Sequence, residues 1–452
     1  MRAISLKALV YTFSPATLHP LLKRIESSAV GSRLARGVFW SMAGAVISRG
    51  LMLCASVLVV RMLGKTGYGE LGMIQSTVGM FGVFADFGLG MTATKHVAEF
   101  RQSDPERTGR IIGLSGLFAL LTGGLMALGL FIFAPWLASN TINAPHLASV
   151  LRIGAAILFI NALNGAQTGA LSGFEAFKTI ARVNLFVGLI SFPIMVAGAY
   201  VGGLTGAVWA LAINLCFNWL LNHIALRREA RRCSVPFTLN GCMSEWPVLW
   251  KFSLPAVLGG TLVGPVNWIC NTMLVNRPGG YSEMGIYSAA NQWFAMFMFL
   301  PGILGSVLLP ILSDQMGQNN STQFKKTVAM AIKINFIIVV PMIIAASVAS
   351  PYIMSLYGED FINGWKTLVI VLITAGLLSI QSPVGQIIAA SGKMWTGLLM
   401  NFGWALVFIL TTFFIINMGA FGLATSRAIA YVFHAIWTFW FAFIVLRTKK
   451  IK

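Results

Sequence analysis

The sequence predicts an all-α polytopic membrane protein in which twelve transmembrane helices form two parallel six-helix lobes around a central cleft. Three observations lead to this fold class: an apolar composition, twelve apolar stretches of spanning length, and an internal repeat. Of the 452 residues, 57% are hydrophobic and 10% are charged, whereas an average soluble domain has about 25% charged residues. The composition therefore excludes an ordinary soluble enzyme and a disordered chain.

Twelve stretches reach the roughly 20 apolar residues that a membrane-crossing helix needs. Six precede a basic segment, at roughly 38–60, 71–94, 111–134, 147–172, 183–201 and 204–224. Six follow it, at roughly 253–275, 283–309, 330–350, 367–390, 396–416 and 420–446. The predicted organisation is a basic cytoplasmic leader at 1–36, an N-terminal lobe at 37–225, a basic cytoplasmic linker at 226–252, a C-terminal lobe at 253–446 and a cytoplasmic tail at 447–452.

The distribution of basic residues predicts the orientation. The chain has 32 Lys and Arg against 13 Asp and Glu, a net charge of +19. With both termini in the cytoplasm, 25 of the 32 basic residues fall in cytoplasmic segments, three lie within spans, and the external connections hold only four, Arg61, Lys65, Arg277 and Lys366. Because cytoplasmic loops carry the excess of Lys and Arg, we interpret the charge as an orientation signal and expect no nucleic-acid partner.

An internal repeat divides the chain into two equivalent halves. Residues 67–72 match 280–285 at an offset of 213, and Gly203 and Gly206 match Gly419 and Gly422 at an offset of 216. A third match pairs Gln167 and 172–173 with Gln386 and 391–392 at an offset of 219. The offset corresponds to six helices, an even number, so both halves cross the membrane in the same sense. Parallel repeats of this kind place a substrate site between them, near the bilayer midplane.

Four short motifs suggest a family. Residues 61–64, 67–69 and 84–89 resemble the opening signature of the polysaccharide flippases, as does Phe252–Pro255 at the start of the seventh span. These flippases belong to the multidrug/oligosaccharidyl-lipid/polysaccharide exporter superfamily, and twelve helices suit the O-antigen branch. The resemblance implies a flippase that carries an undecaprenyl-pyrophosphate-linked oligosaccharide, an O-antigen or exopolysaccharide repeat unit, across the bacterial inner (plasma) membrane by alternating access.

Ionisable side chains within spans are costly and are candidates for function. Four are apparent: Arg49, Asp86, Arg152 and Arg427. Asp86 lies on a stripe with Gln75, Gly79, Gly82 and Gly90, and Arg49 lies at a similar depth on the first span. We predict that Asp86 and Arg49 either form an ion pair between two helices or contact substrate. Arg152 is near the outer end of its span, where it either snorkels to the interface or binds substrate.

The last span carries Arg427, Tyr431, His434 and Thr438 on one face. The offset of 216 places His434 opposite Asn218, and Asn214 lies one turn before Asn218 on the sixth span. We interpret these two stripes as the walls of a wet central cleft, with Arg427 as a ligand for a pyrophosphate or an acidic sugar. Three arginines against one aspartate give the spans a net charge of +2, which suits an anionic cargo.

The remaining expectations follow from what flipping requires. A flippase forms no covalent bond, so we expect no enzyme activity, no metal and no cofactor. The five scattered cysteines lack metal-ligand spacing. A proton or sodium counter-ion is a candidate partner, through His434 or Asp86; the alternative is that His434 is an ordinary interior histidine.

Two other functions stand beside the flippase. One is a multidrug or small-organic exporter of the same superfamily, against which the net positive charge of the spans argues. The other is a membrane-embedded polysaccharide polymerase or ligase, which would need a large loop with clustered carboxylates or histidines. The expected partners are the lipid-linked oligosaccharide and membrane lipids, and a monomer is expected because both lobes lie in one chain.

Overall fold

The computed structural model describes residues 29–236, 238–249, 261–299, 321–391 and 393–448, together with 301–302, 304–305, 308, 311–312 and 315. Within these ranges, side chains are described from residue 48 onward except at 321, 389–390, 394 and 445–448. Most of the predicted leader (1–28), the motif Phe252–Pro255 and the last four residues of the predicted tail lie outside the described residues.

In this part of the chain the regular structure is helical throughout. The first half contributes α3 (Ala29–Asp86), α4 (Leu89–Phe100), α5 (Pro105–Trp136), η2 (Leu137–Thr141), η3 (Pro145–Leu147), α6 (Ala148–Gly173) and α7 (Phe177–Arg232), and short turns follow at η4 (Cys242–Glu245) and α8 (Trp246–Val248). The second half contributes α10 (Val263–Val275), α11 (Gly280–Phe297), α13 (Ser321–Val348), α14 (Ser350–Ser355), η6 (Glu359–Gly364), α15 (Trp365–Ala390), α16 (Met394–Ile415), η7 (Ile416–Met418) and α17 (Gly419–Thr448).

Seven helical runs among the described residues are long and apolar enough to cross a membrane. They are Ser48–Phe100, Pro105–Thr141, Pro145–Gly173, Phe177–Arg232, Thr322–Val348, Glu359–Ile388 and Trp395–Ile444. Three of these runs have 53, 56 and 50 residues, well beyond the roughly 20 residues of one crossing. Each of the three contains a glycine at which the chain leaves helical geometry.

The three breaks share one backbone conformation. Gly64 has φ 67° and ψ −179°, Gly203 has φ 54° and ψ −134°, and Gly419 has φ 65° and ψ −140°. A side chain is strongly disfavoured at these angles. Gly203 and Gly419 are the pair that the internal repeat matches, so equivalent glycines turn the chain at equivalent points in the two halves.

The second predicted span differs from the structure. The sequence predicts one helix over 71–94, but α3 ends at Asp86 and α4 begins at Leu89. Phe87 and Gly88 between them have φ 44° and 64°. The break separates Gly90 from the stripe that contains Asp86, and Gly90 instead packs against the backbones of Gly165 and Gly169 on α6.

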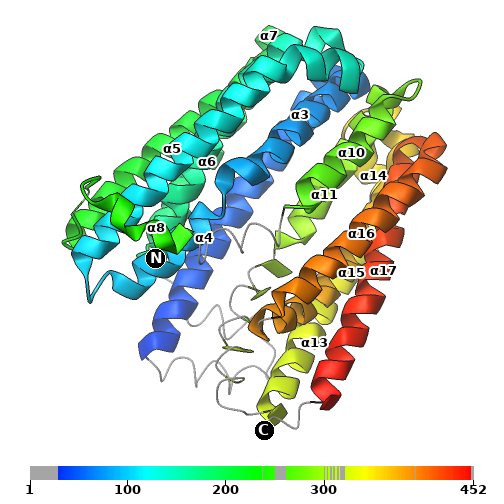
Figure 1. The fold of residues 1–452 in the computed structure, drawn as a ribbon. Helices are drawn as coiled ribbons and strands as arrows, with labels where there is room; N and C mark the ends of the chain where they lie inside the picture. The colour runs from blue at the N-terminus through cyan, green and yellow to red at the C-terminus, as the bar shows by residue number, and fades with distance from the viewer. Residues whose placement is uncertain are drawn as a thin grey trace, which may run out of the picture.

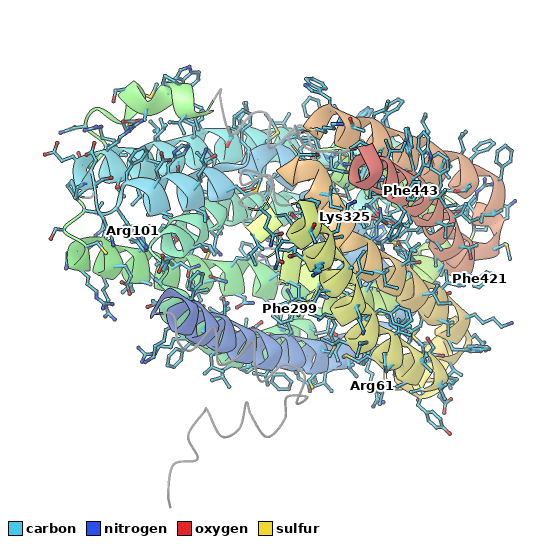
Figure 2. The ribbon with its side chains drawn as sticks, turned by 90° about the horizontal axis from the view of Figure 1, so that it is seen from below. Arg61, Arg101, Phe299, Lys325, Phe421 and Phe443 are labelled. Carbon is cyan, nitrogen blue, oxygen red and sulfur yellow. The ribbon has the colours of Figure 1, made fainter. Side chains whose placement is uncertain are left out.

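Helices α3–α7 and α10–α17 form two groups that lie side by side (Figure 1). In the first group α3 packs on α7, α5 packs on α6, and α6 packs on α7. In the second group α15 and α16 both pack on α17. The groups meet where α3 contacts α10 and α11. Seen from below, Phe299 lies between the two groups (Figure 2).

Helix α5 shows how the chain packs in an apolar surrounding. Its large side chains point outward: Leu125, Ile132 and Phe133 are 64%, 60% and 57% exposed. Its buried positions include many small residues, among them Gly109, Gly113, Ser115, Ala119 and Gly123. This pattern is the reverse of a soluble helix and is typical of membrane helices, which approach one another closely over small residues.

The breaks provide a test of the fold. We expect Gly203→Ala to lower the free energy of unfolding by about 1–3 kcal/mol, because alanine is strained at a positive φ. Gly202→Ala is the matched control, since a methyl group at either position has no atom within 4 Å and only Gly203 has the unusual φ. Thermal unfolding of both variants in the same detergent measures the difference. Equal melting temperatures would contradict the assigned break.

Candidate functional site

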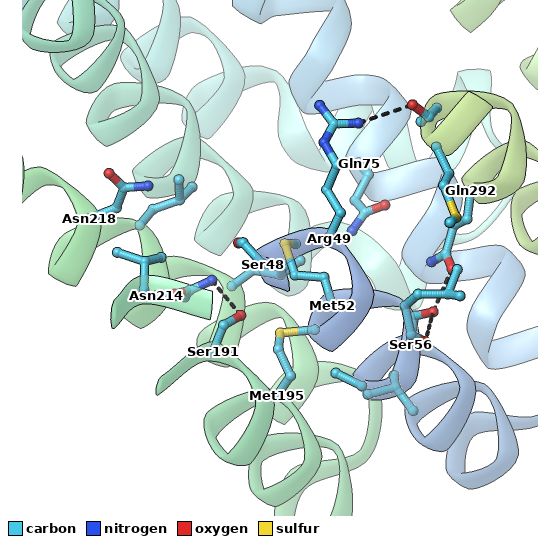
Figure 3. A pocket seen from close by; sticks show the side chains of 18 of the residues that line it. Ser48, Arg49, Met52, Ser56, Gln75, Ser191, Met195, Asn214, Asn218 and Gln292 are labelled. Atoms are coloured by element: carbon cyan, nitrogen blue, oxygen red, sulfur yellow. Dashed lines mark hydrogen bonds between the residues drawn. The ribbon is translucent and has the colours of Figure 1, made fainter. Parts of the chain in front are cut away.

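A cavity of about 630 Å³ lies between α3, α7 and α11 (Figure 3). Residues 48–75 of α3 form one wall, and residues 184–218 of α7 form a second. The third wall comes from Gln292, Ala295 and Met296 of α11, with Phe299 just beyond the helix. Because α11 belongs to the second half, the cavity lies where the two halves meet, and its volume falls within the range of small-molecule sites.

Arg49 carries the only charge among the described residues that line this cavity. Its side chain is exposed, and its Nη1 atom donates a hydrogen bond of 3.0 Å to the carbonyl oxygen of Ala295. The guanidinium also lies 4.3 Å from the centre of the Phe299 ring. Arg49 therefore reaches from the first half to the second, and it gives the cavity a positive charge.

Amides and hydroxyls supply the rest of the polar lining. On α7, Asn214 Nδ2 donates to Ser191 Oγ at 2.8 Å, and Asn218 lies one turn further along. Across the cavity Ser56 Oγ donates to Gln292 Oε1 at 2.5 Å, and Gln292 Nε2 donates to the hydroxyl of Tyr68. Methionine and leucine side chains supply apolar parts of the lining, including Met52, Met195 and Leu211. The walls thus offer one cation and several neutral hydrogen-bonding groups.

The structure places three of the eight predicted site residues in this cavity: Arg49, Asn214 and Asn218. Arg427 and Tyr431 lie together within the second half, with the Arg427 guanidinium 5.8 Å from the Tyr431 ring centre. Arg427 is 8% exposed and does not line the cavity. The net charge of +2 that the sequence assigns to the spans is therefore not gathered in one site.

The two matched polar stripes mainly join helices within each half. In the first half, Asn222 Nδ2 donates to Asn164 Oδ1 at 2.6 Å and to Asn218 Oδ1 at 2.7 Å. At the equivalent place in the second half, the Gln381 amide lies 2.6 Å from His434 Nδ1 and 3.1 Å from Thr438 Oγ1. Asn222 and Thr438 are equivalent under the offset of 216, and each belongs to a hydrogen-bond cluster that joins helices within its own half.

Asp86 and Arg152 lie elsewhere. Asp86 is the last residue of α3, and a methyl group added to Gly165 would lie 3.0 Å from its Oδ1 atom, so the carboxylate faces α6. The ion pair predicted with Arg49 is absent from the described residues. Arg152 is exposed on α6, with its guanidinium 5.2 Å from the Phe131 ring centre, as expected of a side chain at the apolar surface.

Sequence reasoning missed several lining residues. Ser48, Ser56, Asn184 and Ser191 were not among the candidates, although each is a polar residue within or beside an apolar stretch. Serine and asparagine also occur at contacts between membrane helices, so the residue type alone does not indicate that a position lines a cavity. Tyr68 belongs to the repeat and to the motif at 67–69, and neither pattern predicts that it lines a cavity.

Comparisons with known proteins place the chain in a family. A family model described as polysaccharide biosynthesis protein matches residues 34–316, and the MatE model matches residues 255–414. The chain is 23% identical over 394 residues to the EPS I polysaccharide export inner membrane protein EpsE of Ralstonia nicotianae, covering 86% of this chain and 89% of the relative. It is 22% identical over 414 residues to a putative O-antigen transporter of Shigella flexneri, covering 89% and 96%.

The fold is also known from solved structures. The chain superposes with a TM-score of 0.75 on a multidrug resistance MATE family transporter of the MOP superfamily in an inward-facing conformation. The match covers 91% of this chain and 99% of the other at 15% identity. The likeness shows that the two chains share a fold.

The cavity boundary can be tested on α7. We expect a cysteine at Asn218, which lines the cavity, to react with a small thiol reagent about tenfold faster than a cysteine at Asn222, since reaction at a buried site requires local opening. Asn222 is one turn away and 5% exposed. Both variants are made in a background lacking the five native cysteines. Faster labelling at 222 would place the cavity on the wrong face of α7.

Proposed function

The chain belongs to the polysaccharide biosynthesis protein family, and from this we propose that it is a flippase for an undecaprenyl-pyrophosphate-linked oligosaccharide, an O-antigen or exopolysaccharide repeat unit, which it carries across the inner membrane by alternating access. The observation that carries the proposal is the cavity between the halves, in which Arg49 is the only charged group among the described lining residues. Such a cavity favours an anionic head group.

The chemistry of the lining matches the parts of such a head group. A guanidinium stays charged in a low dielectric and binds phosphate oxygens with parallel hydrogen bonds. Sugar hydroxyls both donate and accept, as amides do. The Oδ1 atom of Asn214 is buried and has no partner among the described residues, so it can accept from a cargo hydroxyl once the wall opens locally. Neutral partners of this kind bind weakly enough to permit release.

The relatives support the cargo class. EpsE is named for polysaccharide export and the Shigella flexneri relative for O-antigen transport, and a third, ExoT of Rhizobium meliloti, is named for succinoglycan transport. An exporter of cationic drugs, the alternative within the superfamily, would be expected to bind its cargo with carboxylates. The cavity lining contains none among its described residues.

We further propose that the chain crosses the membrane twelve times in two six-helix lobes, at 37–225 and 253–446. Seven apolar runs, three of them bent into two crossings each, give ten, and α10 and α11 add two. The linker at 226–252 joins the lobes, and its first residues, 226–232, continue helix α7. Both termini lie in the cytoplasm in this arrangement.

Arg49 provides the main test. We expect Arg49→Gln to slow flipping by about 10- to 100-fold, the factor that corresponds to losing a hydrogen bond to a charged group worth about 1.5–3 kcal/mol. The measurement is transfer of undecaprenyl-pyrophosphate-linked oligosaccharide between leaflets of proteoliposomes. Arg152→Gln is the matched control, because it removes an arginine that lies at the outer surface beside Phe131.

An unchanged rate in Arg49→Gln would remove the assigned phosphate contact. Wild-type protein that fails to move the lipid-linked oligosaccharide, but exports an organic cation, would instead favour the drug exporter.

The orientation has a separate test. We expect a cysteine at Lys366, which is exposed at the start of α15, to react with a membrane-impermeant thiol reagent added to whole cells. A cysteine at Arg228, exposed near the end of α7, should react only after the cells are opened. The positive-inside rule places these two positions on opposite sides. The reverse pattern would invert the topology.

A further inference from the structure

Helix α11 contacts the first half along one stripe, here called the interface stripe: Tyr281, Gly285, Ser288, Gln292 and Ala295. These positions are spaced by four, three, four and three residues, so they share one face of a helix. Gly285 packs against the backbone of Lys65, and Ser288 packs against Gly72 of α3. Gln292 bonds to Ser56 and Tyr68, and the carbonyl of Ala295 accepts from Arg49. The interface stripe therefore closes the contact between the halves.

A second stripe of α11 holds Arg427. Arg427 Nη1 donates to Asn291 Oδ1 at 2.7 Å and to the Tyr287 hydroxyl at 3.2 Å. The guanidinium lies 4.0 Å from the Phe294 ring centre. Tyr287, Asn291 and Phe294 follow one another at spacings of four and three, and at about 100° per residue they lie about a third of a turn from the interface stripe.

Among the residues that the structure describes, no carboxylate pairs with Arg427. Its partners are a hydroxyl, an amide and aromatic faces, no ion pair to it occurs among the described residues, and its Nε atom has no partner. Burying a cation without a carboxylate is expensive. All the groups that compensate this cost, apart from Tyr431 on the same helix, come from the second stripe of α11. The contacts of the Arg427 guanidinium therefore join α17 to about two turns of α11.

We propose that Arg427 is a positioning residue that sets the rotation and height of α11, so that the interface stripe meets α3 and closes one end of the path between the halves. Arg427 acts through α11 and does not contact the cargo. The same helix carries both contacts, so loss of the Arg427 contacts frees the interface stripe to move. The proposal requires only that the two halves separate where the interface stripe meets α3. It does not depend on what is transported.

The contact can be measured with a disulfide across it. A Cβ atom at position 72 would lie 3.1 Å from the Cβ of Ser288, slightly less than the roughly 3.5–4.5 Å of a disulfide. The pair Gly72→Cys and Ser288→Cys, in a background without native cysteines, reports how often α11 meets α3. The rate of oxidative cross-linking is measured in cargo-free proteoliposomes.

We expect Arg427→Lys to slow this cross-linking about fivefold or more, the lower end of a typical coupling between sites. Lysine keeps the charge but cannot bond Asn291 and Tyr287 in a fixed fork. Asn291→Ala and Tyr287→Phe, which remove one acceptor each, should slow it in the same direction. Arg152→Lys is the matched control and should leave the rate unchanged.

A second cysteine pair separates positioning from general loss of structure. Gly123→Cys and Ala162→Cys join α5 to α6 within the first half, where a Cβ at 123 would lie 2.8 Å from that of Ala162. The rate of cross-linking at this second pair should be unaffected by Arg427→Lys, because neither helix contacts α11 or α17 through Arg427.

An unchanged rate at the 72–288 pair in all three variants overturns the proposal, as does an equal fall at both pairs. If Arg427 instead contacts cargo, the cargo-free rate stays at the wild-type value and only flipping falls, which also overturns it. The cross-linking rate is measured without cargo, so this test gives the same result whether or not the protein is a flippase.

Discussion

The close approach of α3 and α11 is the contact on which the arrangement of the two halves depends. A side chain added at Gly69 would collide with the backbone of Tyr281, and one added at Gly285 would collide with the backbone of Lys65. In a membrane no hydrophobic effect drives helices together, so close packing over small residues and hydrogen bonds must hold them. The cavity lies beside this crossing, and the positions of Arg49 and Gln292 follow from it.

The absence of water in the bilayer core also determines which polar residues line the cavity. A polar side chain within the bilayer must find a protein partner or face a wet space. Asn222 Nδ2 donates to Asn164 Oδ1, and the Gln381 amide bonds to His434 Nδ1. These residues join helices within one half and leave little free for cargo. Polar residues that are exposed at the cavity wall, such as Arg49, are the ones a head group can contact.

Much of the fold could be predicted because it rests on patterns that are local in the sequence. Gly203 and Gly419 mark equivalent breaks, and Gly72 and Gly285, matched by the repeat, both lie at the crossing of α3 and α11. The break after Asp86 was not predicted, because Phe87 adopts a positive φ that its residue type does not signal.

The site was harder to predict, for a physical reason. In a membrane helix both the lipid-facing and the buried faces are apolar, so the sequence shows which residues share a stripe but not what the stripe faces. The sequence groups Arg427, Tyr431 and His434 on one stripe, and in the structure Arg427 bonds to α11 while His434 bonds to α15, both within the second half. Arg49 and Asp86 lie at similar predicted depths but on different surfaces, because Arg49 lines the cavity whereas Asp86 faces α6.

Two arginines, one from each half, hold helix α11, and their difference in exposure separates their roles. Arg427 is 8% exposed and is enclosed by aromatic rings, so an anion from the cavity cannot reach it without opening the second half. Arg49 is exposed to the cavity and bonds only a neutral carbonyl on α11. A phosphate accepts a stronger, charge-assisted bond than a carbonyl does, so an anionic head group competes directly with Ala295 for Arg49. Binding of such a head group therefore removes one of the bonds between the halves while the Arg427 contacts keep α11 in place within its own half.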